Sequence, residues 1–202
     1  MFTGIVAGRG TVLSHERIQG RSALSIELPV DARGDLEVGA SIALDGVCLT
    51  VVAFDQDRVD FDLIGSTLST TTLGLLIAGQ QVNVERAARF GDEIGGHELS
   101  GHISTTATVE AVSADDGNHV MSFALDPEWM RFILEKGYIA VDGCSLTVVS
   151  TTEQSFEIWL IPETLDRTGL GDKVAGDLVN IEIDAKTQAV VETVERIMGA
   201  RT

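Results

Sequence analysis

A small set of polar residues stands in otherwise apolar segments of this chain. Their types suit the binding of a small polar ligand or a catalytic cluster. The clearest is His102, since an imidazole titrates near neutral pH. Two regions hold the others: Ser41, Cys48 and Thr50, then Asp142, Ser145 and Thr147. Polar groups on strands cost free energy unless they are paired. Two interpretations of His102 are therefore open, a hydrogen-bonded core residue and a member of a ligand-binding or catalytic cluster.

The two regions are copies of each other, because the chain contains an internal duplication. The stretch DGVCLTVV at 45–52 recurs 97 residues later as DGCSLTVV at 142–149. The same offset relates three further pairs of segments: 63–74 and 160–171, 79–85 and 176–182, and 2–6 and 99–103. His102 thus stands where the first copy has Ile5. A duplication of this extent predicts two similar domains in tandem.

The recurring residues favour one small ligand for each domain. Thr50 recurs as Thr147 and Thr67 recurs as Thr164, so each copy is expected to hold the same polar ligand in the same way. No phosphate-binding loop, dinucleotide fingerprint or Ser-His-Asp signature stands in the sequence. His97 and His102 are five residues apart, whereas the zinc-protease helix motif needs four, so no metal site is expected.

Hydrophobic alternation predicts six short strands in each copy. In the first copy they cover 2–13, 23–28, 41–44, 47–54, 58–64 and 82–86, and in the second 101–112, 119–125, 138–141, 144–151, 154–161 and 178–183. A short helix is expected before each hairpin, clearest at 127–135, and the connector 73–79 has helical potential. Six short strands with alternating patterning favour a closed barrel, which leaves no sheet edge exposed.

The tail from Thr187 to Met198 predicts one amphipathic helix, since its apolar residues recur at spacings of three and four. That helix either packs back on the barrels or pairs with copies of itself. The predicted fold is all-β, with two tandem six-stranded antiparallel Greek-key barrels and a C-terminal α-helix. The expected domains are 1–97, 98–186 and the helix 187–202.

The composition excludes several classes of protein. A net charge of −17, from 14 basic and 31 acidic residues, repels phosphate backbones, so nucleic acid is not an expected partner. No apolar run approaches the roughly 18 to 20 residues of a membrane span, and no signal peptide is expected. The two cysteines make no disulfide framework, and small buried hydrophobes are their simplest interpretation. A cytoplasmic location fits them best.

Seven short motifs together carry a family resemblance. They are MFTGIV at 1–6, GVCLTV at 46–51, ERAARF at 85–90, DEIGGH at 92–97, SGH at 100–102, DGCSLT at 142–147 and IPETL at 161–165. With them the chain resembles the riboflavin synthase alpha-chain family over nearly its whole length, the duplication included.

The resemblance implies tandem lumazine-binding barrels and a C-terminal helix that gathers three chains into a homotrimer. It implies that two molecules of 6,7-dimethyl-8-ribityllumazine exchange a four-carbon unit, giving riboflavin and 5-amino-6-(D-ribitylamino)uracil. No metal or redox cofactor is implied, because the lumazine supplies an acidic 7-methyl group and an electrophilic ring carbon. The first barrel of one chain would face the second barrel of a neighbour, with the two lumazines stacked between them. Association with a lumazine synthase is left open.

Matched positions give the expected substrate contacts. The first barrel's pocket would use Gly4, Ile5, Val6, Cys48, Leu49, Thr50, Asp62, Leu63, Ile64, Gly65, Ser66 and Thr67. The second would use Gly101, His102, Ile103, Lys136, Ser145, Leu146, Thr147, Leu160, Ile161, Pro162, Glu163, Thr164 and Leu165. Strand backbone groups would bind the pyrimidinedione edge, while Thr67 and Thr164 would reach the ribityl chain.

The resemblance also implies catalytic roles. His102 would transfer protons, and Ser41 and Cys48 would assist addition and elimination at the donor ring. Three more residues complete the expected catalytic set: Phe2, which would order the N-terminal segment over the site, Thr147, beside the 7-methyl group or its attacking water, and Asp142.

Two departures from the family pattern bear on these expectations. Val47 stands where the family often has a cysteine, a change expected to affect only packing. Gly65 and Ser66 stand where many members carry a lysine and a glutamate, whereas the second copy keeps Glu163, so ribityl binding in the first barrel is expected to be weaker. The alternative is a non-catalytic lumazine- or flavin-binding protein of the same fold, such as the bioluminescence antenna proteins. Those proteins tend to lose the histidine at 102 and the cysteine at 48, and both are present here.

Overall fold

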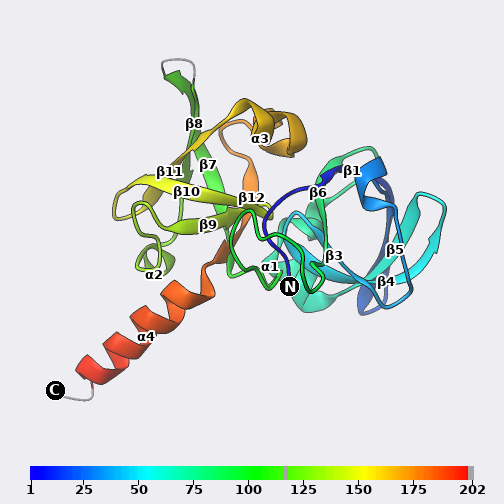
Figure 1. The fold of residues 1–202 in the computed structure, drawn as a ribbon, viewed down its shortest axis with the longest axis horizontal. Coiled ribbons are helices and arrows are strands. Elements are labelled where there is room, and N and C mark those ends of the chain that lie inside the picture. Colours follow the sequence, from blue (N-terminus) through cyan, green and yellow to red (C-terminus); the bar gives the residue numbers. More distant parts are fainter. Residues whose placement is uncertain (116–117, 200–202) are drawn as a thin grey trace.

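Twelve strands form two closed antiparallel barrels in the computed structural model, which describes residues 1–115 and 118–199. Figure 1 shows the barrels side by side, with the N-terminus between them and the last helix directed away from both. The first barrel contains β1 (Gly8–Ile18), β2 (Arg21–Glu27), β3 (Ser41–Leu44), β4 (Val47–Asp55), β5 (Arg58–Ile64) and β6 (Gln81–Arg86). The second contains β7 (Thr105–Asp115), β8 (Asn118–Ala124), β9 (Tyr138–Val141), β10 (Cys144–Thr151), β11 (Ser155–Leu160) and β12 (Leu178–Ile183).

Both barrels have the same Greek-key order, as the duplication predicts. In the first, the strands run β1-β2-β5-β4-β3-β6 around the barrel, so that β2 pairs with β5 and β3 with β6. The second repeats this order with every strand number raised by six. The predicted all-β fold of two six-stranded antiparallel barrels and a C-terminal helix is confirmed.

The interior of each barrel is a packed apolar core, because the strands alternate inward apolar and outward polar residues. In β5, Val59, Phe61 and Leu63 are fully buried, whereas Asp62 and Ile64 face outward. The equivalent strand β11 buries Phe156, Ile158 and Leu160 in the same way. Each barrel therefore presents its polar side chains on its outer surface.

Tight turns close the central hairpin of each barrel where the sequence predicts them. Asp45 and Gly46 join β3 to β4 with φ of 44° and 80°, and Asp142 and Gly143 join β9 to β10 with φ of 44° and 78°. Two successive positive φ values are typical of the hairpin turns that Asp-Gly favours.

The predicted starts of the first strand in each barrel are wrong. Strands were expected over 2–13 and 101–112, but β1 begins at Gly8 and β7 at Thr105. Residues before these points leave their own barrel and pair with each other and with the other barrel. Phe2 and Leu99 form an isolated antiparallel bridge, with backbone N–H···O distances of 2.8 and 3.0 Å. The alternating apolar residues in these segments are buried between the two barrels and not inside one barrel.

Four α-helices and three short 3₁₀ helices connect the strands of the described residues. The α-helices are α1 (Gly65–Thr70), α2 (Pro127–Met130), α3 (Pro162–Arg167) and α4 (Ala185–Gly199), and the 3₁₀ helices are Val30–Ala32, Thr72–Leu75 and Gly169–Asp172. The helix expected over 127–135 is shorter, because it ends at Met130 and the buried residues Phe132 and Ile133 follow in turns. Helices α1 and α3 were not predicted.

Helix α4 keeps most of its apolar stripe in solvent. Val190, Val194, Ile197 and Met198 are between 48% and 65% exposed, whereas Val191 packs against the second barrel's core. An ion pair between Arg131 and Glu195, at 3.0 Å, ties the helix to the loop after α2. No helix of the described residues is long and apolar enough to cross a membrane.

A buried polar network joins the two barrels at the ends of their central hairpins. The amide of Asn83 donates to the carbonyl of Asp142 at 2.8 Å, and the amide of Asn180 donates to the carbonyl of Asp45 at 2.9 Å. The carboxylates of Asp45 and Asp142 accept the backbone N–H groups of Asn83 and Asn180, each at 2.7 Å. The duplication thus produces a near two-fold contact between the copies.

Candidate functional site

The segments that precede β1 and β7 are exchanged between the barrels. The backbone N–H of Cys48, on β4, donates to the carbonyl oxygen of Gly101 at 2.8 Å. The backbone N–H of Ser145, on β10, donates to the carbonyl oxygen of Gly4 at 2.9 Å. Each segment therefore lies along the central hairpin of the other barrel.

A buried glutamate anchors each exchanged segment to its own barrel. Glu85, on β6, accepts from the backbone N–H and the hydroxyl of Thr3 at 2.6 and 2.8 Å and from the N–H of Gly4 at 3.0 Å. Glu182, on β12, accepts the same three bonds from Ser100 and Gly101, at 2.7, 2.7 and 3.0 Å. Burial raises the pKa of both carboxyl groups, and these hydrogen bonds oppose the rise. These two sets of hydrogen bonds fix the backbone positions of the residues that follow, Ile5 and His102.

Glycine is required where the segments meet the opposite hairpins. A Cβ atom at Gly101 would lie 2.5 Å from the Cβ of Cys48, and one at Gly4 would lie 2.5 Å from the Cβ of Ser145. Both glycines also have positive φ, 80° and 76°. Close approach and left-handed backbone together leave glycine as the residue that fits.

The contacts that these segments make differ from the predicted grouping into pockets. Gly4, Ile5 and Val6 were assigned to the first barrel's pocket, but Gly4 contacts Ser145 of the second. Gly101, His102 and Ile103 were assigned to the second, but Gly101 contacts Cys48 of the first, and the side chain of Ile103 packs on the first barrel's core. The repeat identifies equivalent residues, whereas the contacts run between the copies rather than within them.

The remaining first-barrel residues share one outward face of β3, β4 and β5. Ser41 pairs with Thr50 across β3 and β4. Val51 pairs with Phe61 in the core, so the preceding Thr50 lies opposite Asp62 on the outer surface. Ser41, Thr50 and Asp62 thus form a line across three strands, called here the first-barrel row, and Cys48 lies beside it on β4.

The second barrel repeats this face with different residues. Thr147 pairs with Tyr138 across β9 and β10. The core pair of Val148 with Ile158 places Thr147 opposite Trp159 on the outer surface. Tyr138, Thr147 and Trp159 form the second-barrel row, with Ser145 beside it on β10. Tyr138 and Trp159 were not among the predicted contacts, although the repeat places them at the positions of Ser41 and Asp62.

Four predicted contact residues point away from both rows. Leu49 and Leu63 lie in the first barrel's core and Leu146 and Leu160 in the second's, each at most 9% exposed. The period of two along a strand puts alternate residues on opposite faces, so a continuous range of predicted contacts necessarily includes core residues. Only the backbone of these leucines is available to a ligand.

The other predicted contacts continue from the ends of the rows. Residues 64–67 and 161–165 lead from β5 and β11 into α1 and α3, and Ile64 and Ile161 are each 62% exposed. Glu163 pairs with Arg167 one turn along α3, an ion pair that Ser66 on α1 does not have. Lys136 is exposed at a positive φ of 64°, two residues before Tyr138, and its N–H donates to Val148.

The structure separates two of the predicted catalytic residues from the outer rows. Phe2 is buried in a small cluster between the barrels that includes Leu99, Ala43 and Ala140, with Cys48 packed against it. Asp142 is 1% exposed at the hairpin turn, where its carboxylate contacts Lys173 at 3.1 Å. Both therefore lie at the contact between the barrels, Phe2 behind Cys48 and Asp142 in the polar network.

His97 lies beside the second-barrel row, although it was not among the predicted site residues. Its Nδ1 lies 2.7 Å from the hydroxyl of Ser145, its ring stacks on Tyr138 with centroids 4.9 Å apart, and its N–H donates to Thr3. The Nε2 atom is buried and has no hydrogen-bond partner among residues 1–115 and 118–199. Burial lowers the pKa of this imidazole, and Asp184 acts against that shift. The pairing with Ser145 depends on a contact between barrels, so spacing along the sequence does not reveal it.

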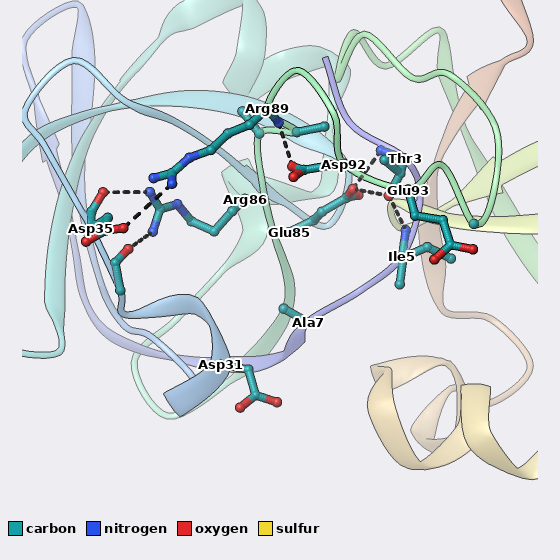
Figure 2. A pocket seen from close by; sticks show the side chains of 14 residues that line it. Thr3, Ile5, Ala7, Asp31, Asp35, Glu85, Arg86, Arg89, Asp92 and Glu93 are labelled. Atoms are coloured by element: carbon teal, nitrogen blue, oxygen red, sulfur yellow. Dashed lines mark hydrogen bonds and ion pairs between the residues drawn. The ribbon is translucent and has the colours of Figure 1, made fainter.

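A cavity of about 760 Å³ adjoins the exchanged N-terminal segment (Figure 2). Thr3, Ile5 and Glu85 line one side of it, and Asp92 and Glu93 project from the loop between the barrels. Arg86 points across it to the carbonyls of 32, 34 and 35. Of the predicted contacts it contains Ile5, but neither row. The rows lie instead on the outer faces of the barrels, and Ser41 lines a separate cavity of about 530 Å³.

The comparisons with known proteins agree with this architecture. The family model for the lumazine binding domain matches the chain twice, at residues 3–87 and 100–184. The riboflavin synthase of Escherichia coli (strain K12) is 50% identical over 202 residues, covering 100% of this chain and 95% of that protein. The riboflavin synthase of Chlamydia pneumoniae is 42% identical over 200 residues, covering 99% and 98%. LumP complexed with riboflavin superposes with a TM-score of 0.85 at 28% identity, covering 91% of this chain and 100% of LumP.

Proposed function

The chain belongs to the riboflavin synthase family and has that family's enzymatic function, and on this premise we propose how its two outer faces carry out the reaction. Each row and the exchanged segment beside it bind one molecule of 6,7-dimethyl-8-ribityllumazine. A four-carbon unit passes from one lumazine to the other, which gives riboflavin and 5-amino-6-(D-ribitylamino)uracil. The observation that carries this proposal is the duplicated face, because a reaction between two identical substrates needs two equivalent sites.

The first-barrel face holds the groups suited to addition and proton transfer. His102 follows Gly101, whose carbonyl accepts the N–H of Cys48, so the backbone at His102 adjoins the face that holds the thiol and the row of Ser41 and Thr50. His102 moves the proton of the 7-methyl group, while Ser41 and Cys48 assist addition to the ring and elimination from it. No external cofactor is needed for this chemistry, since the lumazine provides both the acidic carbon and the electrophile.

The second face binds the other lumazine. Ser145 and Thr147 occupy the places of Cys48 and Thr50, and Ile5 lies beside them where the first face has His102. Thr67 and Thr164 reach the two ribityl chains from α1 and α3. Phe2 and Asp142 support catalysis indirectly, since both are buried where the barrels meet.

Three chains associate through α4 in this proposal, and the first face of one chain meets the second face of its neighbour. The exposed apolar stripe of α4 and the openness of both rows support a homotrimer. The domains are 1–97, 98–186 and 187–202, of which 200–202 lie outside the described residues. The enzyme is cytoplasmic, and a lumazine synthase is a candidate partner of the assembled trimer.

The test is to mix the purified chain with 6,7-dimethyl-8-ribityllumazine alone and follow visible absorbance. Riboflavin should accumulate over many turnovers, and His102→Ala and Cys48→Ala should each reduce the rate by about 100-fold or more. Cys144→Ala is the matched control, because this thiol is buried in the second barrel's core and its pKa is raised to about 12 by burial. It should retain most of the activity.

The second candidate function is a non-catalytic lumazine or flavin carrier, which the superposition on LumP favours. A carrier would show the spectrum of bound lumazine without any turnover, and one ligand for each monomeric chain. The same absorbance measurement separates the two functions. In that outcome Ser66→Glu is the first substitution to make.

A further inference from the structure

The two faces differ at the positions that flank the recurring threonine. In the first-barrel row, Thr50 lies between Ser41 and Asp62, and Asp62 forms an ion pair with Arg21. In the second-barrel row, Thr147 lies between Tyr138 and Trp159. The same strand geometry thus presents a polar and charged face on one barrel and an aromatic face on the other.

The aromatic residues are exposed although the chain contains few of them. The sequence has one tyrosine and two tryptophans, and the second-barrel row holds the tyrosine and one tryptophan. Tyr138 is 53% exposed and Trp159 is 44% exposed, whereas the other tryptophan, Trp129, packs against the barrel core. Large aromatic side chains left in solvent on a strand face are typical of a binding surface.

The structure also holds one of the rings in place. His97 stacks on Tyr138 with an interplanar angle of 15°, and His97 is itself fixed by Ser145 and by the backbone of Thr3. Neighbouring strands lie about 4.8 Å apart, so Tyr138 and Trp159, two strands apart, are separated by about 9.6 Å across Thr147. A flat ring system laid over Thr147 can contact both side chains.

We propose that Tyr138 and Trp159 determine the specificity of the second site, which holds a flavin ring system more tightly than the first site does. The proposal rests on the function proposed above, since that function gives the chemical class of the ligand. Stacking increases with the area of the ring, so the tricyclic flavin gains more from the two aromatic side chains than the bicyclic lumazine. The first-barrel row has no aromatic residue and depends on hydrogen bonds.

The test titrates the full-length chain with riboflavin by calorimetry and follows the emission of the flavin itself. Trp159→Leu should weaken one class of riboflavin site by about tenfold or more, in line with stacking energies measured for other planar rings. The bound flavin, whose emission is quenched on contact with tryptophan, should become brighter. Trp159→Phe should restore most of the affinity, because phenylalanine keeps an aromatic face.

Asp62→Asn is the matched control at the equivalent position of the first barrel, and it should leave the tight class unchanged. The proposal is overturned if Trp159→Leu binds and quenches riboflavin as the parent does, or if Asp62→Asn is the variant that loses the tight class. Failure of the proposed function gives a different result, namely riboflavin binding at this row without turnover of lumazine.

Discussion

The N–H of Cys48 donates to the carbonyl of Gly101, and the N–H of Ser145 donates to the carbonyl of Gly4, at 2.8 and 2.9 Å. The two bonds are copies of each other under the sequence repeat, yet each joins one barrel to the other. The residues proposed for proton transfer and addition, His102 and Cys48, are therefore brought together by contact between domains. Activity and the contact between the barrels should respond to the same substitutions.

Gly101→Ala tests this dependence. The new Cβ would lie 2.5 Å from that of Cys48, so the segment carrying His102 must move. We expect a loss of stability of about 3 kcal/mol or more, from overpacking and left-handed strain together, and a large loss of turnover. Chemical denaturation and the absorbance assay measure the two effects.

Gly20→Ala separates the strain from the clash. Gly20 has nearly the same φ, 81°, but nothing lies within 4 Å of its added Cβ. It should cost only about 1 to 2 kcal/mol and leave turnover intact. Equal losses in the two variants would show that the close contact at Cys48 is unimportant.

Asp45→Asn should stabilise the chain, and more so at higher pH. Burial and the neighbouring Asp142 raise the pKa of Asp45 well above its usual value, so the folded state binds a proton that the unfolded state releases. Stability contributed by this proton is present at low pH and is lost as pH rises above the ordinary carboxyl range. Asparagine keeps the acceptor for the N–H of Asn83, tolerates the positive φ and carries no charge.

Thermal unfolding from pH 5 to 8 measures this effect, with Asp142→Asn as the comparison. Asp142 has Lys173 as its partner at 3.1 Å, so its neutralisation leaves a half-buried ammonium without that ion pair. Burial raises the pKa of Asp142 as well, and Lys173 opposes that rise, so the gain from neutralising this carboxylate is offset by the lost ion pair. We expect Asp142→Asn to stabilise the chain less than Asp45→Asn does. Equal shifts in the two variants would mean that the two carboxylates share the lysine evenly.

His97→Asn should reduce the loss of stability in acid. Burial lowers the pKa of His97, so the unfolded chain takes up a proton that the folded chain resists as pH falls below about 6.5. Asparagine places an amide near the position of Nδ1, within reach of the Ser145 hydroxyl, and does not titrate. The unfolding midpoint should fall less between pH 7 and pH 5 than in the parent. An unchanged acid profile would show that His97 does not control it.

Val194→Asp combined with Ile197→Asp tests the proposed trimer. Both side chains are about half exposed on the apolar stripe of α4, so charges there should dissociate the assembly without unfolding a barrel. Analytical ultracentrifugation should report a particle near the chain mass of 21.5 kDa. Arg196→Asp adds a negative charge to the other side of the helix and should leave the assembly whole. Dissociation by Arg196→Asp as well would point to net charge rather than the stripe.

The sequence predicted the barrels well because local patterning decides them. The alternation around Val59, Phe61 and Leu63 and the Asp-Gly turns located strands to within a few residues. The contacts between barrels were beyond such reasoning. Residues 2–6 and 99–103 have similar sequence patterns, so neither their composition nor the repeat offset predicts which barrel each segment contacts. The contact of His97 with Ser145 depends on how the barrels pack together, so the sequence alone does not predict it. The aromatic second-barrel row likewise depends on which residues lie opposite each other on neighbouring strands.

The exchanged segments also determine which backbone hydrogen bonds can form only late in the synthesis of the chain. All six strands of the first barrel have been made once Arg86 has left the ribosome, but the N–H of Cys48 finds its acceptor only after Gly101 has followed. Phe2 likewise forms its bridge only after Leu99 has been made. Glu85 can thus hold the segment before β1 on the first barrel until the second barrel has been made, and the contacts between the barrels form last.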